Sequence, residues 1–269
     1  MQVHALRQAP GYAARMLLGI DHLVIAVADP DHVSLQLERE PGLTSATGGR
    51  HDELGTFNRL VWLGDSYLEL IGVFERRLAE RSWLGVPTLR MLERGGGLAT
   101  WAIATDALAA DLAALHAAGS DLGEPIDGER RRADGAVIRW RLATSSRLGP
   151  SEPPFLIEHD SSAAEWTPAE RATRAAQPHP LGTVHLEALE LVVDDVNQAI
   201  QRFRRTVGLL FRPSLAGGGS RDAEVGSQFV RLRPRRSGSG SAVIHVAAPV
   251  PAEQIVELLG CRWVVSPTR

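Results

Sequence analysis

The chain repeats one order of elements, a strand, then a helix, then several strands, and this repeat restricts the possible folds more than any other feature. The first copy opens with a buried strand, indicated by the aliphatic and β-branched run LGIDHLVIAV at residues 18–27. Asp29 and Pro30 then suit the N-cap and the first turn of a short helix. The first copy therefore comprises a strand at 18–27, a helix at 30–38 and strands at 57–63 and 67–73.

The same order follows twice more. Gly119 ends an alanine-rich helix in the second copy, and Asp194 or Asp195 caps the helix of the third. The second copy is predicted to have strands at 98–105, 136–143 and 154–159 and a helix at 107–118. The third is predicted to have strands at 186–193, 209–212, 228–233 and 242–248, with a helix that ends near Val207. Such a repeat predicts an α+β fold built from βαβββ modules.

The composition excludes several classes of function and of binding site. The 269 residues are 44% hydrophobic and 23% charged, as in ordinary globular proteins, and a net charge of -3 offers no broad basic surface for nucleic acid. The sequence contains no lysine, which excludes Schiff-base chemistry and a P-loop. Cys261 is the only cysteine, which excludes disulfide frameworks and cysteine-rich zinc sites. No apolar run approaches the roughly 18 residues of a membrane span, so we expect a cytoplasmic protein.

Three segments of the first copy resemble the vicinal oxygen chelate superfamily, and more narrowly the bacterial glyoxalase-like domain proteins. They are IDHLVIAV at 20–27, GGRH at 48–51 with GTFNRLV at 55–61, and SYLELI at 66–71. The resemblance implies that two modules pair into a cupped mixed sheet that holds a small ligand. The expected organisation is a disordered extension over residues 1–17, the paired modules over 18–160, a linker over 161–182 and a third C-terminal module over 183–269.

The resemblance also implies that His22 and Glu69 hold a divalent metal. Such proteins commonly take a histidine from the first strand of this module and a glutamate from its last strand. An imidazole and a carboxylate suit Mn, Fe, Ni, Zn or Co, and open positions on the ion let two adjacent substrate oxygens bind. Glu69 lies among Leu68 and Leu70, so a buried carboxylate here requires a partner.

The second module departs from this pattern. When the first and last strands of the two modules are superposed by sequence, Thr100 stands where His22 does and Ile157 stands where Glu69 does. A bulge could turn Glu158 inward, and His159 lies on the same strand face as Ile157, so either is a candidate for a substitute ligand. The matching positions of the third module are Ala188 and either Ile244 or His245.

Other polar and aromatic side chains are expected to line the cup. His51 follows two glycines and has the reach for general acid–base catalysis or for a third metal position. Asn58 can bind a substrate carbonyl or close its own loop, and Trp62, on the same strand face, can form a wall or pack in the core. Trp101 is expected to face the helix behind the sheet, and the run at 129–132 to be a solvated hairpin tip. The catalytic candidate is His51, and the substrate-binding candidates are Asn58, Trp62, Tyr67 and His159.

Three kinds of function remain open at this point. The first is a metal-dependent lyase or isomerase that acts on a substrate with two adjacent oxygens. The second is a protein of the bleomycin-resistance type, which sequesters a small molecule without turnover and can dispense with metal. The third is a structural or regulatory descendant. The partner is expected to be a small molecule rather than nucleic acid or membrane, and the third module could pair across a homodimer.

Overall fold

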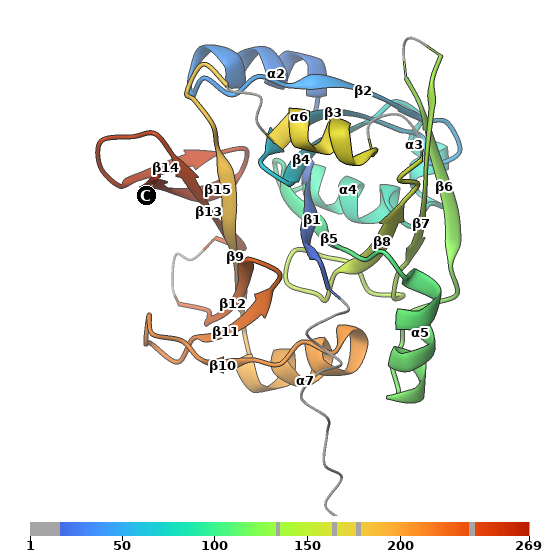
Figure 1. Ribbon diagram of the computed structural model, residues 1–269, viewed down its shortest axis with the longest axis vertical. Coiled ribbons are helices and arrows are strands. Elements are labelled where there is room, and N and C mark those ends of the chain that lie inside the picture. The colour runs from blue at the N-terminus through green and yellow to red at the C-terminus, as the bar shows by residue number, and fades with distance from the viewer. Residues whose placement is uncertain (1–16, 133–134, 163–165, 176–178, 237–239, 269) are drawn as a thin grey trace, which may run out of the picture.

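The computed structural model describes residues 17–132, 135–162, 166–175, 179–236 and 240–268, which form two β-sheets that lie side by side (Figure 1). The first sheet closes into a barrel in the order β1-β4-β3-β2-β6-β7-β8-β5. Its strands are β1 (Gly19–Ala26), β2 (Ala46–His51), β3 (Thr56–Leu63), β4 (Ser66–Val73), β5 (Gly97–Ala104), β6 (Ile126–Arg131), β7 (Val137–Ala143) and β8 (Phe155–His159). The α+β fold of βαβββ modules predicted from the repeat is thereby confirmed.

The two modules of the barrel are related by a local two-fold arrangement. Strand β1 runs parallel to β4 of its own module and antiparallel to β5 of the next, and β5 runs parallel to β8 in the same way. The barrel closes where β2 meets β6, with Arg50 opposite Arg131. Neither β2 nor β6 was expected as a strand, because glycine pairs and charged runs are typical of turns.

The helices follow the capping signals in the sequence. Asp29 caps α2 (Pro30–Arg39) by accepting hydrogen bonds from the backbone of Asp31 and His32, and helix α5 (Leu108–Ala117) covers the second module. The connection between the modules contains two short helices, α3 (Arg76–Ala79) and α4 (Gly85–Leu92). Residues 161–182, predicted to be a linker, contain helix α6 (Pro168–Ala175).

The second sheet has the order β10-β11-β12-β9-β13-β15-β14. It contains β9 (His185–Val193), helix α7 (Val196–Val207) capped by Asp195, β10 (Arg212–Pro213), β11 (Arg221–Val225), β12 (Gln228–Pro234), β13 (Ala242–Ala248), β14 (Gln254–Leu258) and β15 (Cys261–Pro267). The strand parallel to β9 is β12, so the prediction that residues 242–248 end the third module was wrong. Strand β13 instead pairs antiparallel with β9, as β5 does with β1. Strands β13, β14 and β15 therefore form a fourth, shortened module without a helix.

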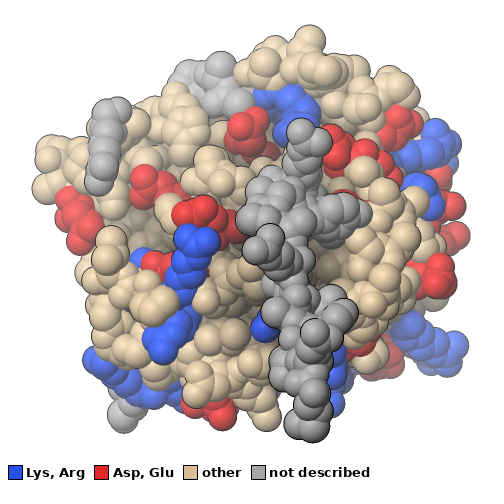
Figure 2. Space-filling model, turned by 60° about the horizontal axis from the view of Figure 1, so that its bottom comes forward, with Lys and Arg blue, Asp and Glu red and all other residues tan. Residues whose placement is uncertain are grey.

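One hydrophobic core joins the two sheets. Trp101 lies behind β5, as predicted, and its ring stacks on Phe203 of α7 with 6.2 Å between the ring centroids. No helix in the described ranges is long and apolar enough to span a membrane. On the face shown in Figure 2, acidic and basic side chains are interspersed rather than gathered into one patch.

Candidate functional site

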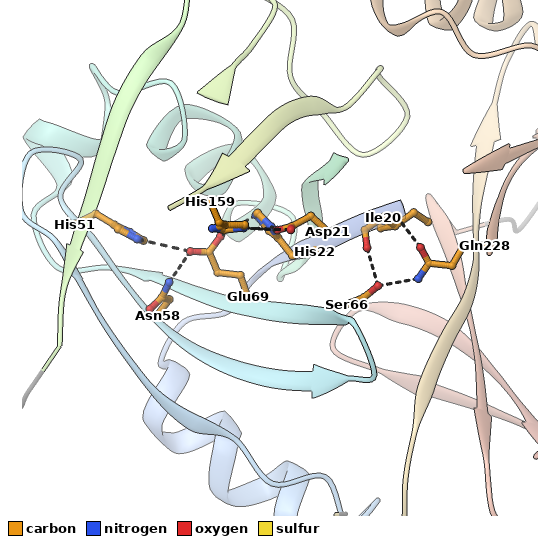
Figure 3. A network of polar contacts seen from close by, with 9 residues as sticks. All are labelled: Ile20, Asp21, His22, His51, Asn58, Ser66, Glu69, His159 and Gln228. Carbon is orange, nitrogen blue, oxygen red and sulfur yellow. Dashed lines mark hydrogen bonds and ion pairs between the residues drawn. The ribbon is translucent and has the colours of Figure 1, made fainter. Parts of the chain in front are cut away.

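A bulge in β1 turns two consecutive side chains into the barrel. Ile20 pairs with Ile103 and His22 pairs with Ala102, which leaves Asp21 as the extra residue. In a regular strand neighbouring side chains point to opposite faces. Here Nδ1 of His22 lies 2.6 Å from Oδ1 of Asp21, and both side chains are buried (Figure 3).

Asp21 joins two histidines. Its carboxylate oxygens each lie 3.1 Å from Nε2 of His159 on β8. Burial by itself would raise the pKa of Asp21, but the contacts with His159 and His22 outweigh burial and hold this pKa well below 3.8. An ionised carboxylate only accepts hydrogen bonds, so Nδ1 of His22 and Nε2 of His159 donate to it. In a neutral His22 ring, Nε2 is then left unprotonated.

Glu69, on β4, has the partners that a buried carboxylate requires. Asn58 donates a hydrogen bond of 2.6 Å from Nδ2 to Oε1. Nε2 of His22 lies 3.7 Å from Oε2, and Nε2 of His51 lies 3.8 Å from Oε1. The sequence-predicted residues His22, His51, Asn58 and Glu69 are thus brought together on the inside of the barrel (Figure 3).

His51 is held in the same manner as His22. Its Nδ1 lies 3.0 Å from the hydroxyl of Thr56, and its ring meets Trp140 edge-on. Burial lowers the pKa of His51 below 6.5, although the charge of Glu69 raises it. His51 is therefore neutral at pH 7, the state in which an imidazole can bind a metal or accept a proton.

The donor set around Glu69 suits a divalent ion by type and orientation. Metal-binding histidines usually bond through the nitrogen that is not held by a carboxylate or other polar group, and here Asp21 and Thr56 hold the Nδ1 atoms. Two ligand atoms that each lie about 2.1 Å from one ion are about 3 to 4 Å apart. The distances from Nε2 of His22 and Nε2 of His51 to the Glu69 oxygens, 3.7 and 3.8 Å, fall in this range. Within the described ranges no three His, Cys, Asp or Glu side chains are already gathered into a metal-binding cluster.

Two neighbouring cavities reach these residues. The inner cavity, about 40 Å³, is lined by His22, His51, Asn58, Tyr67 and Glu69 together with aromatic side chains. The outer cavity, about 850 Å³, opens at the barrel end next to β2, β6 and β7. Side chains that line both cavities are His51, Leu54, Trp83, Trp140, Leu142 and His159.

The connector between the two sheets supplies part of the inner wall. Trp166, just before α6, stacks on His159 with ring centroids 3.4 Å apart and planes at 8°. Tyr67 lines the cavity and stacks on His22. Trp62 packs against Tyr67 and Trp166 and stands behind the wall, so its predicted role as a substrate-binding residue is not what its position favours.

Strand register corrects the predicted equivalences. Val24 pairs with both Thr100 and Glu69, and Ala102 pairs with both His22 and Phe155. Thr100 therefore is equivalent to His22, as predicted, but Phe155 rather than Ile157 is equivalent to Glu69. The sequence superposition of β8 on β4 was shifted by two residues, because the loop before β8 differs from the loop before β4. Hence the second module supplies no metal-binding side chain at either position.

The third module carries a charged residue at the position equivalent to Glu69. Glu190 pairs with Arg231 across β9 and β12 as Val24 pairs with Glu69, so Arg231, rather than Ile244 or His245, is equivalent to Glu69. Glu190 contacts Arg233 at 2.5 Å and His245 at 3.8 Å, and Arg231 bonds to Asp222 at 2.7 Å. This face of the second sheet holds an ion-pair network where the barrel holds its candidate ligands.

Several site residues were not predicted from the sequence. Arg130, from the run expected to be a solvated hairpin tip, is 5% exposed and lines the inner cavity. Along β6 the buried side chain of Arg130 lies between two exposed neighbours, as expected for a strand with one face turned inward. Recognising a strand here would therefore have indicated that Arg130 can face the cavity. Asp21, Trp83, Trp140 and Trp166 were also missed. Glu158 lines only the outer cavity, whereas His159 reaches the inner one.

Comparison with known proteins agrees with this architecture. The glyoxalase-like domain family matches residues 20–207. No curated protein sequence matches the chain. A hypothetical protein from Staphylococcus aureus has a similar structure, with a TM-score of 0.75, 15% identity, and coverage of 93% of this chain and 99% of that chain. Methylmalonyl-CoA epimerase from Mycobacterium tuberculosis, at 19% identity and a TM-score of 0.40, covers 56% of this chain and 92% of its own.

The family match covers the barrel from residue 20 onward, includes β9 of the second sheet and stops at the end of α7. The match, the βαβββ repeat and the cup-facing residues agree with one another. The chain belongs to the glyoxalase-like domain family.

Proposed function

We propose that this protein is a divalent-metal-dependent lyase or isomerase that acts on a small molecule with two adjacent oxygens. One observation carries the proposal: the unbonded Nε2 atoms of His22 and His51 face opposite oxygens of Glu69 at 3.7 and 3.8 Å. In a neutral His22 ring whose Nδ1 donates to Asp21, the lone pair on Nε2 and the Glu69 carboxylate repel each other unless a cation lies between them. A bound ion supplies that cation.

His22, His51 and Glu69 are the proposed ligands, and Mn, Fe, Ni, Zn or Co suits two imidazoles and a carboxylate. Such an ion polarises substrate oxygens and stabilises negative charge that develops on them. His51 is thus assigned to the metal rather than to general base catalysis, because its Nε2 faces Glu69.

The remaining side chains orient the ligands and move a proton. Asn58 fixes the carboxylate of Glu69, and Asp21 fixes the ring of His22. His159 donates to Asp21 through Nε2, and its buried Nδ1 has no hydrogen-bond partner within the described ranges. Burial lowers the pKa of His159, although Asp21 raises it, so the ring is neutral near pH 7. A neutral histidine oriented by a carboxylate can accept a proton from the substrate.

The two cavities divide the substrate between them. The inner cavity is narrow and much of its wall is aromatic or aliphatic, which keeps water away from the reacting oxygens. The rest of the molecule would occupy the outer cavity, where arginine and acidic side chains are mixed. A cytoplasmic location and a homodimer stay predictions of the sequence.

Metal analysis of protein purified without chelator tests the proposal. We expect stoichiometric Mn, Fe, Ni, Zn or Co, which His22→Ala, His51→Ala and Glu69→Gln each reduce. His245→Ala is the matched control, because that histidine lies in the second sheet, and it should leave the metal content unchanged. A wild-type protein that neither contains nor takes up any of these ions contradicts the proposal. If His51→Ala keeps its metal, His51 returns to the proton-transfer role.

A second candidate function is sequestration of a small molecule without turnover. It is favoured by one observation, that Thr100 and Phe155 occupy the positions where the second module would otherwise supply ligands. Thermal-shift measurements on metal-free protein with small carboxylates and antibiotics test it, since a ligand that binds only the folded state raises Tm. Stabilisation by such a ligand that persists with chelator and in His22→Ala supports sequestration, and no stabilisation by any of them contradicts it.

A further inference from the structure

Gln228 connects the second sheet to the first strand of the barrel. Its Oε1 accepts a hydrogen bond of 2.6 Å from the backbone nitrogen of Ile20. Its Nε2 donates to the hydroxyl of Ser66 at 2.7 Å and to the carbonyl of Leu186 at 3.2 Å. Ser66 in turn donates to the carbonyl of Ile20 at 2.6 Å (Figure 3). Side chains thus bind both backbone polar groups of Ile20.

Ile20 directly precedes the bulged residue Asp21 in β1. A bulge interrupts the ladder of backbone hydrogen bonds and leaves local groups in need of other partners. Gln228 and Ser66 supply these partners in a place that water does not reach, since both side chains are buried. A buried hydrogen bond between neutral groups is expensive to leave unmade, so this bridge favours one conformation of the bulge.

The tip of the hairpin between β11 and β12 is shaped for this contact. Gly226 lies at the tip with φ of +60°, and a Cβ there would come within 2.2 Å of the carbonyl oxygen of Leu18. The hairpin backbone therefore sits directly against the start of β1, two residues before Ile20. Packing and hydrogen bonding independently place Gln228 at the bulge.

We propose that Gln228 is a positioning residue for the barrel site. By holding Ile20 from the second sheet, it keeps the bulge in the form that turns Asp21 and His22 into the cup together. The Nδ1 proton of His22 then stays on the Asp21 hydrogen bond, and Nε2 stays directed at Glu69. The second sheet thus acts on the site without lining its inner cavity. This inference rests on the proposed function only where metal affinity is the readout.

The test compares the ring tautomer of His22 in four proteins by ¹⁵N-histidine NMR, with the signal assigned from His22→Gln. Gln228→Met keeps the length of the side chain but removes its hydrogen bonds, and Ser66→Ala removes the second link. Thr206→Val is the matched control, because it removes a hydrogen bond of 2.6 Å from α7, which belongs to the third module, to Asp121 in the segment after α5 of the second module. The wild-type ring is expected to be protonated at Nδ1.

In Gln228→Met and Ser66→Ala we expect the ¹⁵N shifts of His22 to move toward the average of two tautomers, while the shifts of His51 stay as in the wild type. In Thr206→Val we expect the His22 shifts to stay as in the wild type. Zn²⁺ affinity is expected to fall about tenfold in the same two variants. Unchanged His22 shifts in both variants overturn the inference, and so does an equal change in Thr206→Val. If Zn²⁺ does not bind the wild type, the proposed function fails, while the NMR shifts still decide the role of Gln228. If Gln228→Met does not fold, Ser66→Ala decides it.

Discussion

Nδ1 of His22 lies 2.6 Å from Oδ1 of Asp21, the residue immediately before it in the chain. Neighbouring side chains in a strand can meet in this way only where the backbone departs from its regular alternation. The contact fixes which ring nitrogen of His22 carries the proton, since ionised Asp21 can only accept. It also links His22 to His159, which binds the same carboxylate from β8, two strands away around the barrel.

Replacing Asp21 with Asn tests the value of this contact. The change keeps the size of the side chain, but an amide no longer requires the Nδ1 proton of His22. Loss of an outer partner of a metal-bound histidine usually weakens metal affinity about 10- to 100-fold, and we expect a loss in that range in competition with a coloured chelator. Asp111→Asn is the control, because Asp111 is a buried aspartate that bonds to Thr105 far from the site. Equal Zn²⁺ affinity in Asp21→Asn and the wild type would contradict this account.

Much of the barrel could be predicted because its signals are local. Periodic apolar runs marked β1, β3, β4 and β5, and Asp29 marked the start of α2. Strand alternation placed Asn58 on one face with Trp62, and the structure brings its side chain within 2.6 Å of Glu69 on the neighbouring strand. These predictions depend only on side-chain periodicity, which the sequence contains directly.

The features that could not be predicted depend on contacts between residues far apart in the sequence. The bulge at Asp21 arises from the register between β1 and β5, and the match of Phe155 to Glu69 depends on where β8 begins against β5. Trp166 reaches the cavity because the connector folds back over the barrel, which the polar composition of residues 161–182 did not indicate. Strand β14 was missed for a similar reason, since it is largely exposed and its residues show no apolar alternation. Local composition carries little information about any of these contacts.

The ion-pair network of the second sheet should make that sheet sensitive to acid. Burial raises the pKa of Glu190, but contact with His245 and the charges of Arg233 and Arg231 outweigh burial and hold this pKa below 4.5. A carboxylate whose pKa is lowered by folding adds stability above its unfolded pKa, and this stability is lost as the pH falls through the folded pKa. We therefore expect the free energy of unfolding to decline from about pH 4.5 downward.

Glu190→Gln should make that decline shallower and reduce stability at pH 7 by about 1 to 3 kcal/mol. Urea unfolding followed at several pH values measures both effects. Glu257→Gln is the control in the same sheet, because Glu257 and Arg262 form an exposed pair, which contributes about 0 to 1 kcal/mol. An acid profile that is the same in Glu190→Gln and the wild type would exclude Glu190 as the source.

Cys261 should be chemically inert in the folded protein. Burial raises the pKa of its thiol to about 11, and the thiolate is the form that reacts with alkylating reagents. We expect almost no modification by iodoacetamide at pH 8 in native protein and complete modification in urea. Because Cys261 lies at the start of β15 in the shared core, its rate of labelling reports opening of the second sheet. Rapid native labelling would show that this part of the core is not closed in solution.

Trp166 should contribute to stability and to closure of the inner cavity at once. It is 5% exposed, stacks on His159 and packs against Trp62 and Tyr67. Trp166→Ala removes a buried aromatic ring, so we expect the free energy of unfolding to fall by about 3 to 5 kcal/mol. Trp166→Phe retains a stacking ring and should lose much less. If the connector only crosses the barrel end without closing it, both variants will unfold at the wild-type urea concentration, and His159 will show unchanged ¹⁵N ring shifts in Trp166→Ala.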